Sequence, residues 1–247
     1  MLNFRITRGP AALLALGLTV SGFAQAPAVK TEKLFYEADW RLMRAGVATV
    51  TWNGVRQSEL RLETAGLVAK LLTVQNTYRA NYDPGYCVTG ATLDAQEGSR
   101  HRDTKVTFDR AKKKSTYLER DLRKNITVRQ SVIDTPPCVR DVLGALETIR
   151  QRRMSAGQNT TVLISDGKKV INARIECQEK EVIKTKAGTF QTLRYEAFLF
   201  NGELYGRKGR MFIWISEDER RLPVQVRIQL PFIIGTVTLT LEKAERT

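Results

Sequence analysis

The side chains that could carry out catalysis are few in this sequence and are poorly placed. His101, the single histidine, lies between Arg100 and Arg102 in a charged segment, whereas a general base needs a positioned partner and a pocket. The sequence contains no G-x-S-x-G elbow, no HExxH motif and no P-loop, the patterns that would place a nucleophile, a zinc ion or a phosphate. The acidic run 217–219 falls in a predicted turn, where Asp and Glu are common. We therefore expect a protein that is not an enzyme, with no catalytic residue, no metal site and no cofactor.

Two groups of residues could instead bind a ligand. The segment 201–210 (NGELYGRKGR) is rich in glycine and basic residues, so its backbone amides together with Arg207, Lys208 and Arg210 could hold an anion; the alternative is a plain hairpin tip. Aromatic side chains could line a hydrophobic cavity or fill an ordinary core. The three tryptophans are Trp40, Trp52 and Trp214.

The charge of the chain and its first residues indicate where it works. The 247 residues carry a formal net charge of +14, an excess that favours nucleic acid, anionic lipid or acidic glycan as a neighbour. Arg5 and Arg8 precede the apolar run 11–20 and the small residues up to Ala24, which is typical of a cleaved signal peptide over 1–24. The alternative is an uncleaved anchor. No later apolar stretch is long enough for a membrane helix. We therefore predict a periplasmic or secreted protein with no nucleic-acid partner.

The three cysteines predict one disulfide. Exported proteins form disulfides, and this sequence has no CxxC redox motif and no metal-ligand spacing. Cys87 follows a turn and Cys138 precedes a predicted helix, so both lie in loop-like places. Cys177 alternates with polar residues on the apolar side of a predicted strand. We predict a Cys87–Cys138 disulfide and a buried thiol at Cys177.

Period-2 alternation dominates the chain and predicts strands. In the last 38 residues, 212–215 forms one strand, Pro223 opens its return, and Val237, Leu239 and Leu241 alternate with polar residues in the final strand. Strands do not alternate with helices, so the sheet should be antiparallel. We predict a mainly β fold: a single curved antiparallel sheet or half-open β-barrel of roughly a dozen strands, with one or two helices packed on the concave side. Residues 25–33 form a tether and 34–247 a single domain.

Two segments break the alternation. Residues 139–154 carry one apolar stripe at helical spacing, with Asp141 favouring the start and Arg150 favouring the end through the helix dipole. Residues 65–72 (AGLVAKLL) are apolar nearly throughout and favour a short helix or a connection packed on the sheet. The R-A-G sequence 44–46 predicts the turn of the first hairpin.

Several motifs together resemble one bacterial family. They are DVLGAL at 141–146, W-x-S-x-D at 214–218, R-L-P-V at 221–224, and L-x-Y-x-A-x-W at 34–40. With these motifs, the chain from about residue 32 to its end resembles the domain-of-unknown-function family DUF3108; Glu217 and the ETIR sequence at 147–150 depart slightly from its pattern. The resemblance implies an exported envelope protein and supplies no catalytic residues. The strand order is also similar to the half-barrels of the lipoprotein carrier LolA and its acceptor LolB, which implies helices over an apolar concavity.

These observations lead to one main functional hypothesis. The protein is expected to be a non-enzymatic binder of a hydrophobic or amphiphilic envelope ligand, such as a lipid, a lipoprotein acyl chain or a glycolipid, with its basic rim contacting an anionic head group. The alternative is a structural or assembly factor that contacts envelope proteins or peptidoglycan. Neither hypothesis identifies a protein partner.

Overall fold

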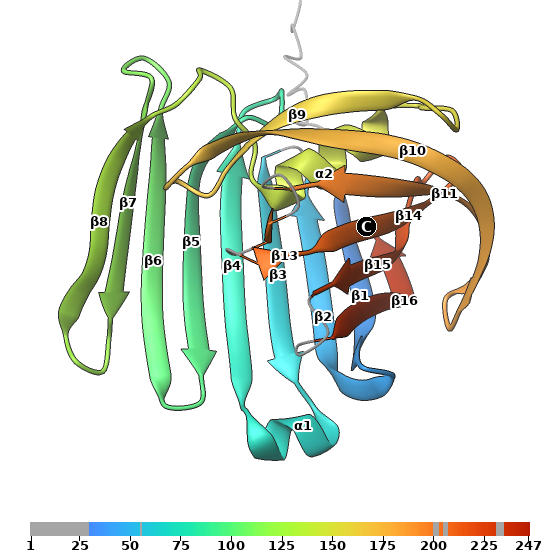
Figure 1. The fold of residues 1–247 in the computed structure, drawn as a ribbon, viewed down its shortest axis with the longest axis horizontal. Coiled ribbons are helices and arrows are strands. Elements are labelled where there is room, and N and C mark those ends of the chain that lie inside the picture. Colours follow the sequence, from blue (N-terminus) through green and yellow to red (C-terminus); the bar gives the residue numbers. More distant parts are fainter. Residues whose placement is uncertain (1–29, 55, 200–202, 205–206, 231–234) are drawn as a thin grey trace, which may run out of the picture.

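The computed structural model describes residues 30–247 except 55, 200–202, 205–206 and 231–234, so the predicted signal peptide 1–24 lies outside the described residues. One antiparallel sheet of fourteen strands forms the body of the protein (Figure 1). Its first arm consists of eight strands that pair in chain order. These strands are β1 (Thr31–Trp40), β2 (Met43–Asn53), β3 (Gln57–Thr64), β4 (Val74–Tyr82), β5 (Val88–Glu97), β6 (Arg100–Asp109), β7 (Lys114–Asp121) and β8 (Ile126–Asp134).

The second arm returns from the other side of β1. The last strand, β16, pairs with β1, and the order then runs β15, β14, β11, β10 and β9. Two short strands, β12 and β13, pair only with each other. The strands of this half are β9 (Asn159–Ser165), β10 (Val170–Thr185), β11 (Gly188–Phe198), β12 (Glu203–Leu204), β13 (Arg207–Lys208), β14 (Arg210–Ser216), β15 (Pro223–Gln229) and β16 (Thr236–Arg246). The predicted curved antiparallel sheet is confirmed, and it is not closed into a barrel.

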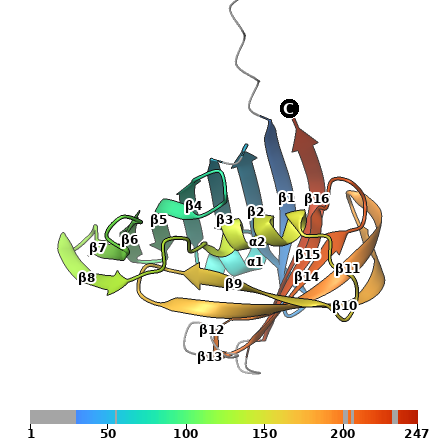
Figure 2. The ribbon, with the colours of Figure 1, turned by 90° about the horizontal axis from the view of Figure 1, so that it is seen from above.

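The helix α2 (Val142–Gln151) lies on the concave side of this sheet, between β2–β4 and β9–β10 (Figure 2). Asp141 caps its first turn by accepting a hydrogen bond from the amide of Gly144 at 2.8 Å, which satisfies one of the free N–H groups of a helix start. Leu143 packs with the apolar side chains of β1 and β2, whereas Ile149 packs with those of β9–β11 and β14. The helix therefore fills the space between the two arms.

The segment that leads into α2 joins the two arms at their open side. The amide of Val88 donates to the carbonyl of Val139 at 2.9 Å, and Arg140 pairs in parallel with Ile164 of the edge strand β9. Cys87 and Cys138 form the predicted disulfide beside this crossing. Cys177 is a buried free thiol, as predicted, and burial raises its pKa. The entry to α2 is thus held covalently to the start of β5.

Three local predictions differ from the structure. The first hairpin turns at Arg41 and Leu42, not at 44–46, because Gly46 pairs inside β2 with Thr64 of β3; a Cβ on this glycine would lie 2.2 Å from the carbonyl oxygen of Glu63. The strand β1 starts at Thr31, inside the predicted tether. The helix α1 (Gly66–Leu71) exists, but all six of its residues are exposed or half-buried.

Candidate functional site

A cavity of about 440 Å³ opens where α2 ends, β1 begins and β16 finishes. It is lined mainly by charged side chains, together with the aromatic rings of Trp52 and Tyr86. The lining residues are Lys30, Glu32, Trp52, Gly54, Tyr86, Glu147, Arg150, Gln151, Arg153, Glu219, Arg220, Arg221 and Arg246. Six of them are basic and three are acidic, so the lining carries a formal net charge of +3.

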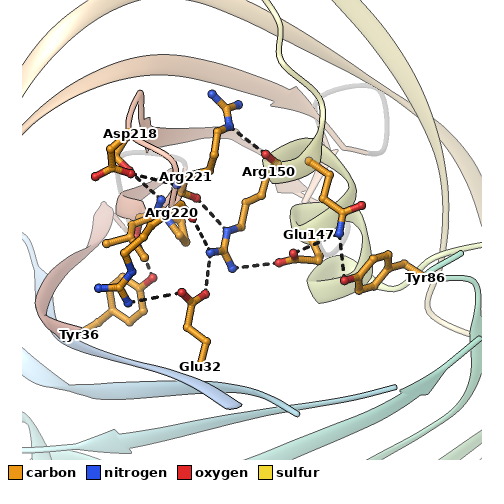
Figure 3. Close-up of polar contacts among 12 residues, drawn as sticks. Glu32, Tyr36, Tyr86, Glu147, Arg150, Asp218, Arg220 and Arg221 are labelled. Atoms are coloured by element: carbon orange, nitrogen blue, oxygen red, sulfur yellow. Dashed lines mark hydrogen bonds and ion pairs between the residues drawn. The ribbon is translucent and has the colours of Figure 1, made fainter. Parts of the chain in front are cut away.

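Arg150 is the centre of the polar network in this wall (Figure 3). Its guanidinium donates to Glu32 at 2.6 Å, to Glu147 at 2.9 Å, and to the carbonyl oxygens of Arg220 and Arg221 at 3.0 and 2.8 Å. The guanidinium carbon also lies 5.1 Å from the centre of the Trp52 ring. One side chain thereby fixes the end of α2, the start of β1 and the turn between β14 and β15 relative to one another.

The electrostatics of this network keep Arg150 charged. Burial alone would lower the pKa of its guanidinium, but Glu147 and Glu32 outweigh burial and raise that pKa above its usual value. For a tyrosine, burial acts in the opposite direction and raises the pKa of the Tyr36 hydroxyl. This hydroxyl donates to the carbonyl oxygen of Pro223 at 2.8 Å. The pKa of Tyr86 is raised by burial and then by the Glu147 charge. Both tyrosines are therefore neutral at neutral pH, and the Tyr86 hydroxyl accepts a hydrogen bond from Nε2 of Gln151 at 3.0 Å.

Two N–H donors beside the cavity have no acceptor. Among the residues that the structure describes, Nε1 of Trp52 and Nε of Arg220 are buried without a hydrogen-bond partner. Buried donors are nearly always paired, since leaving one unpaired costs about 1–3 kcal/mol. Both atoms are closed off from solvent, so a ligand in the cavity would instead meet the exposed guanidinium groups of Arg153 and Arg246.

Of the tryptophans predicted as ligand contacts, Trp52 and Trp214 belong to the same buried cluster, but only Trp52 lines the cavity. Trp52 is buried in the wall of the cavity. Trp214 points to the opposite face of β14 from Ile213, where its indole donates to Glu181 at 3.0 Å. Trp40 lies at the far end of β1, next to the Arg41 guanidinium. Only Trp52 therefore belongs to the candidate site.

The predicted basic contacts lie elsewhere. Arg210 forms two hydrogen bonds to the buried Glu196, at 2.7 and 2.9 Å, and lies over the ring of Phe212. Arg207 and Lys208 form β13, and their side chains lie outside the described part of the structure. His101 contacts Asp94 at 2.9 Å in the middle of the first arm. No cluster of His, Cys, Asp or Glu in the described ranges could hold a metal ion.

Sequence reasoning missed the main residues of the cavity. Glu32 falls in the predicted tether, and the sequence alone indicates for Arg150 only a favourable charge at a helix end. The acidic run 217–219 is the predicted turn after β14, and the amide of Arg221 donates to the Asp218 carboxylate there at 3.0 Å. The one available signal was the position of Arg150 beside the apolar stripe of α2.

The sequence matches one family over most of its length. The model of a family described as "Protein of unknown function (DUF3108)" matches residues 36–242. No curated protein matches the chain. No helix within the described ranges is long and apolar enough to cross a membrane.

Three solved structures align with most of this chain, and the first of them has a similar fold. A β-barrel-like protein of the domain of unknown function DUF1849 from Brucella abortus is 7% identical, with a TM-score of 0.57 over 90% of this chain and 99% of that one. A putative lipoprotein from Parabacteroides distasonis is 11% identical, with a TM-score of 0.33 over 89% and 97% of the two chains. A DUF1089 family protein from Pseudomonas aeruginosa is 12% identical, with a TM-score of 0.38 over 90% and 99%.

Proposed function

Because the chain belongs to the DUF3108 family, whose description assigns no activity, we propose a function from the cavity itself. The protein is a non-enzymatic component of the cell envelope that binds the anionic head group of an amphiphilic envelope molecule beside Arg150. The observation that carries this proposal is the cavity lining of net charge +3, in which Arg153 and Arg246 are exposed. A carboxylate or phosphate would accept hydrogen bonds from these guanidinium groups and neutralise that charge.

The size and lining of the cavity narrow the class of ligand. Its volume of about 440 Å³ lies in the lower half of the range for small-molecule sites, which is enough for a head group or a sugar ring but not for a whole lipid. Trp52 and Tyr86 add two largely buried aromatic side chains to this mostly charged lining. A glycolipid or phospholipid head group fits these features, and its acyl chains would remain outside the cavity.

The filled interior distinguishes this proposal from a carrier that encloses acyl chains. Apolar side chains of α2 occupy the space between the two arms, and all three core clusters contain fully buried residues. The same observation favours the second candidate function, a structural or assembly factor of the envelope. Such a factor would need no small ligand in the Arg150 cavity.

Native mass spectrometry of the protein purified from a periplasmic extract tests the proposal. We expect a bound amphiphile that organic extraction removes and whose mass identifies its head group. The variant Arg153→Glu/Arg246→Glu, which reverses two exposed charges of the lining, should purify without it, whereas the control Arg129→Glu on β8 should retain it. A protein that purifies empty and takes up nothing from an envelope lipid extract would overturn the proposal and favour the assembly factor.

A further inference from the structure

Five apolar side chains project into solvent at the end of the sheet that lies opposite the cavity. Leu42 is 101% exposed, Leu67 73% and Leu71 85%, while Met43 and Leu72 are about half exposed. We call this set the apolar rim. Leu42 lies in the β1–β2 turn and Met43 is the first residue of β2, whereas the other three belong to the connection between β3 and β4 that contains α1.

The two parts of the apolar rim are neighbours. In Figure 1, α1 and the β1–β2 turn lie side by side at the lower end of the sheet. The amide of Ala65 donates to the carbonyl oxygen of Ala45 at 2.9 Å, which ties the start of α1 to β2. On the other side, the amide of Gly98 in the β5–β6 turn donates to the carbonyl oxygen of Thr73 at 2.7 Å. The β1–β2, β3–β4 and β5–β6 connections therefore form one continuous surface at this end of the sheet.

The core of the protein does not account for these leucines. All six residues of α1 are exposed or half-buried, so the helix packs no side chain fully into the sheet. Arg41 and Leu42 have φ angles of 49° and 67°, a left-handed conformation that Asn and Gly adopt easily and a leucine adopts at a cost. The chain thus holds a fully exposed leucine on a strained turn. Such strain is typical of functional segments.

Basic residues accompany the apolar rim. The segments 41–44, 65–73 and 97–100 contain Arg41, Arg44, Lys70 and Arg100 against the single acid Glu97, a formal net charge of +3. All four basic residues are exposed. A second cavity, of about 700 Å³, opens next to Leu42 and is lined by Arg41, Arg227, the acidic Asp39 and several uncharged polar side chains. Exposed leucines beside basic groups are the combination by which proteins attach to the surface of an anionic bilayer.

We propose that the apolar rim docks on an anionic phospholipid membrane, with its leucines in the interfacial region and its basic residues at the lipid phosphates. The ten residues of β1 separate the rim from the Arg150 cavity, a distance of about 30 Å at the rise of a strand. The docked protein would hold that cavity away from the bilayer surface. The proposal stands independently of what the cavity binds.

Co-sedimentation with vesicles tests this proposal. The probes are vesicles of phosphatidylethanolamine and phosphatidylglycerol, compared with vesicles of phosphatidylcholine alone. All variants must share one N-terminus, verified by intact mass, so that only the rim differs between them. We expect the protein to bind the anionic vesicles, and Leu67→Ser/Leu71→Ser/Leu72→Ser to weaken binding by about tenfold or more.

A matched control separates docking from general stickiness. Val128 and Val132 on the edge strand β8 are also exposed, at 40% and 55%, and Val128→Ser/Val132→Ser should bind as the wild type does. Insertion is read directly from a fluorophore sensitive to polarity, attached at Leu71→Cys, because Cys177 is buried and the other two cysteines are paired. Its emission should shift to the blue with anionic vesicles, whereas the same label at Val128→Cys should not respond.

Several results would overturn the proposal. They are a wild-type protein that does not sediment with anionic vesicles, a rim variant that binds as tightly as the wild type, and a label at position 71 that stays in water. A rim variant that keeps vesicle binding but loses a protein partner would assign the surface to that partner instead. Circular dichroism should show unchanged folding, since every substituted side chain is at least 40% exposed.

Discussion

Replacing Arg150 with methionine should destabilise the protein strongly. The variant keeps much of the apolar volume but removes four hydrogen bonds and leaves the carboxylates of Glu32 and Glu147 without this partner. Removing one partner of a buried ion pair costs about 3–5 kcal/mol. We expect the lower end of that range, because Glu32 keeps Arg220 as a second partner at 3.4 Å. For a chain of this size, the loss corresponds to a decrease in Tm of about 6–12 °C.

Two further substitutions isolate the reason for this loss. Arg150→Lys keeps the charge but cannot reach two carboxylates and two carbonyl oxygens with one ammonium group, so it should recover only about half of the lost stability. In Arg150→Met/Glu32→Gln, the two effects should be less than additive by about 1 kcal/mol or more, because the partners are in contact. The exposed Arg153 lines the same cavity, and Arg153→Met should change stability by less than about 0.5 kcal/mol.

The assay is equilibrium unfolding in urea under non-reducing conditions. Tryptophan fluorescence and circular dichroism should report one transition if unfolding is two-state. A decrease in the free energy of unfolding of less than about 1 kcal/mol for Arg150→Met would refute the reasoning. It would mean that the hydrogen bonds of Arg150 to Glu32, Glu147 and the two carbonyl oxygens are not formed in solution. If the lysine and methionine variants were equally stable, the positive charge at this position would contribute nothing without the branched hydrogen bonds of the guanidinium, and the expected half recovery would be wrong.

Two other properties follow from contacts described above. The variant Cys87→Ser/Cys138→Ser removes the disulfide that joins two residues 51 positions apart in the sequence. By the chain-entropy relation, its free energy of unfolding in urea should be lower by about 4 kcal/mol. An unchanged urea midpoint would contradict this prediction. The Arg210 hydrogen bonds hold the pKa of Glu196 below its ordinary value of 4.5, so the stabilisation from this pair is present above that pH and is lost as the pH falls below it. As the pH is lowered from 5 to roughly 3, Glu196→Gln should therefore lose less stability than the wild type. If the two proteins lose the same stability over this range, the Glu196–Arg210 pair does not contribute to acid destabilisation.

The sequence predicts helices and strands well where the spacing of apolar side chains shows which face of the element is buried. The alternation of Val237, Leu239 and Leu241 places them in β16, and the apolar stripe of 139–154 contains α2, with Asp141 as its cap. The pairing of β1 with β16 could not be read in this way. No local pattern specifies which strand lies beside another that is some two hundred residues away along the chain.

The candidate site was less predictable because its contacts are long-range. Arg150 bonds Glu32, 118 residues earlier, and the carbonyl oxygen of Arg221, 71 residues later. Without knowledge of these distant partners, an arginine at the end of a helix indicates only a favourable interaction with the helix dipole. The leucines of α1 show the reverse problem: their composition favours packing on the sheet, but hydrophobicity alone does not say whether a packing surface is present.

The seam between β1 and β16 has a consequence for how the chain folds. Within each arm most strand pairs are hairpins between neighbours in sequence, which close short loops at low entropic cost. The seam instead joins Glu32 to Arg246, a contact of very high sequence separation, and such contacts slow folding. Each arm can therefore form early, while the complete sheet must wait for the last strand. If the chain is exported as we propose, its β1–β16 seam could close only after β16 has crossed the membrane.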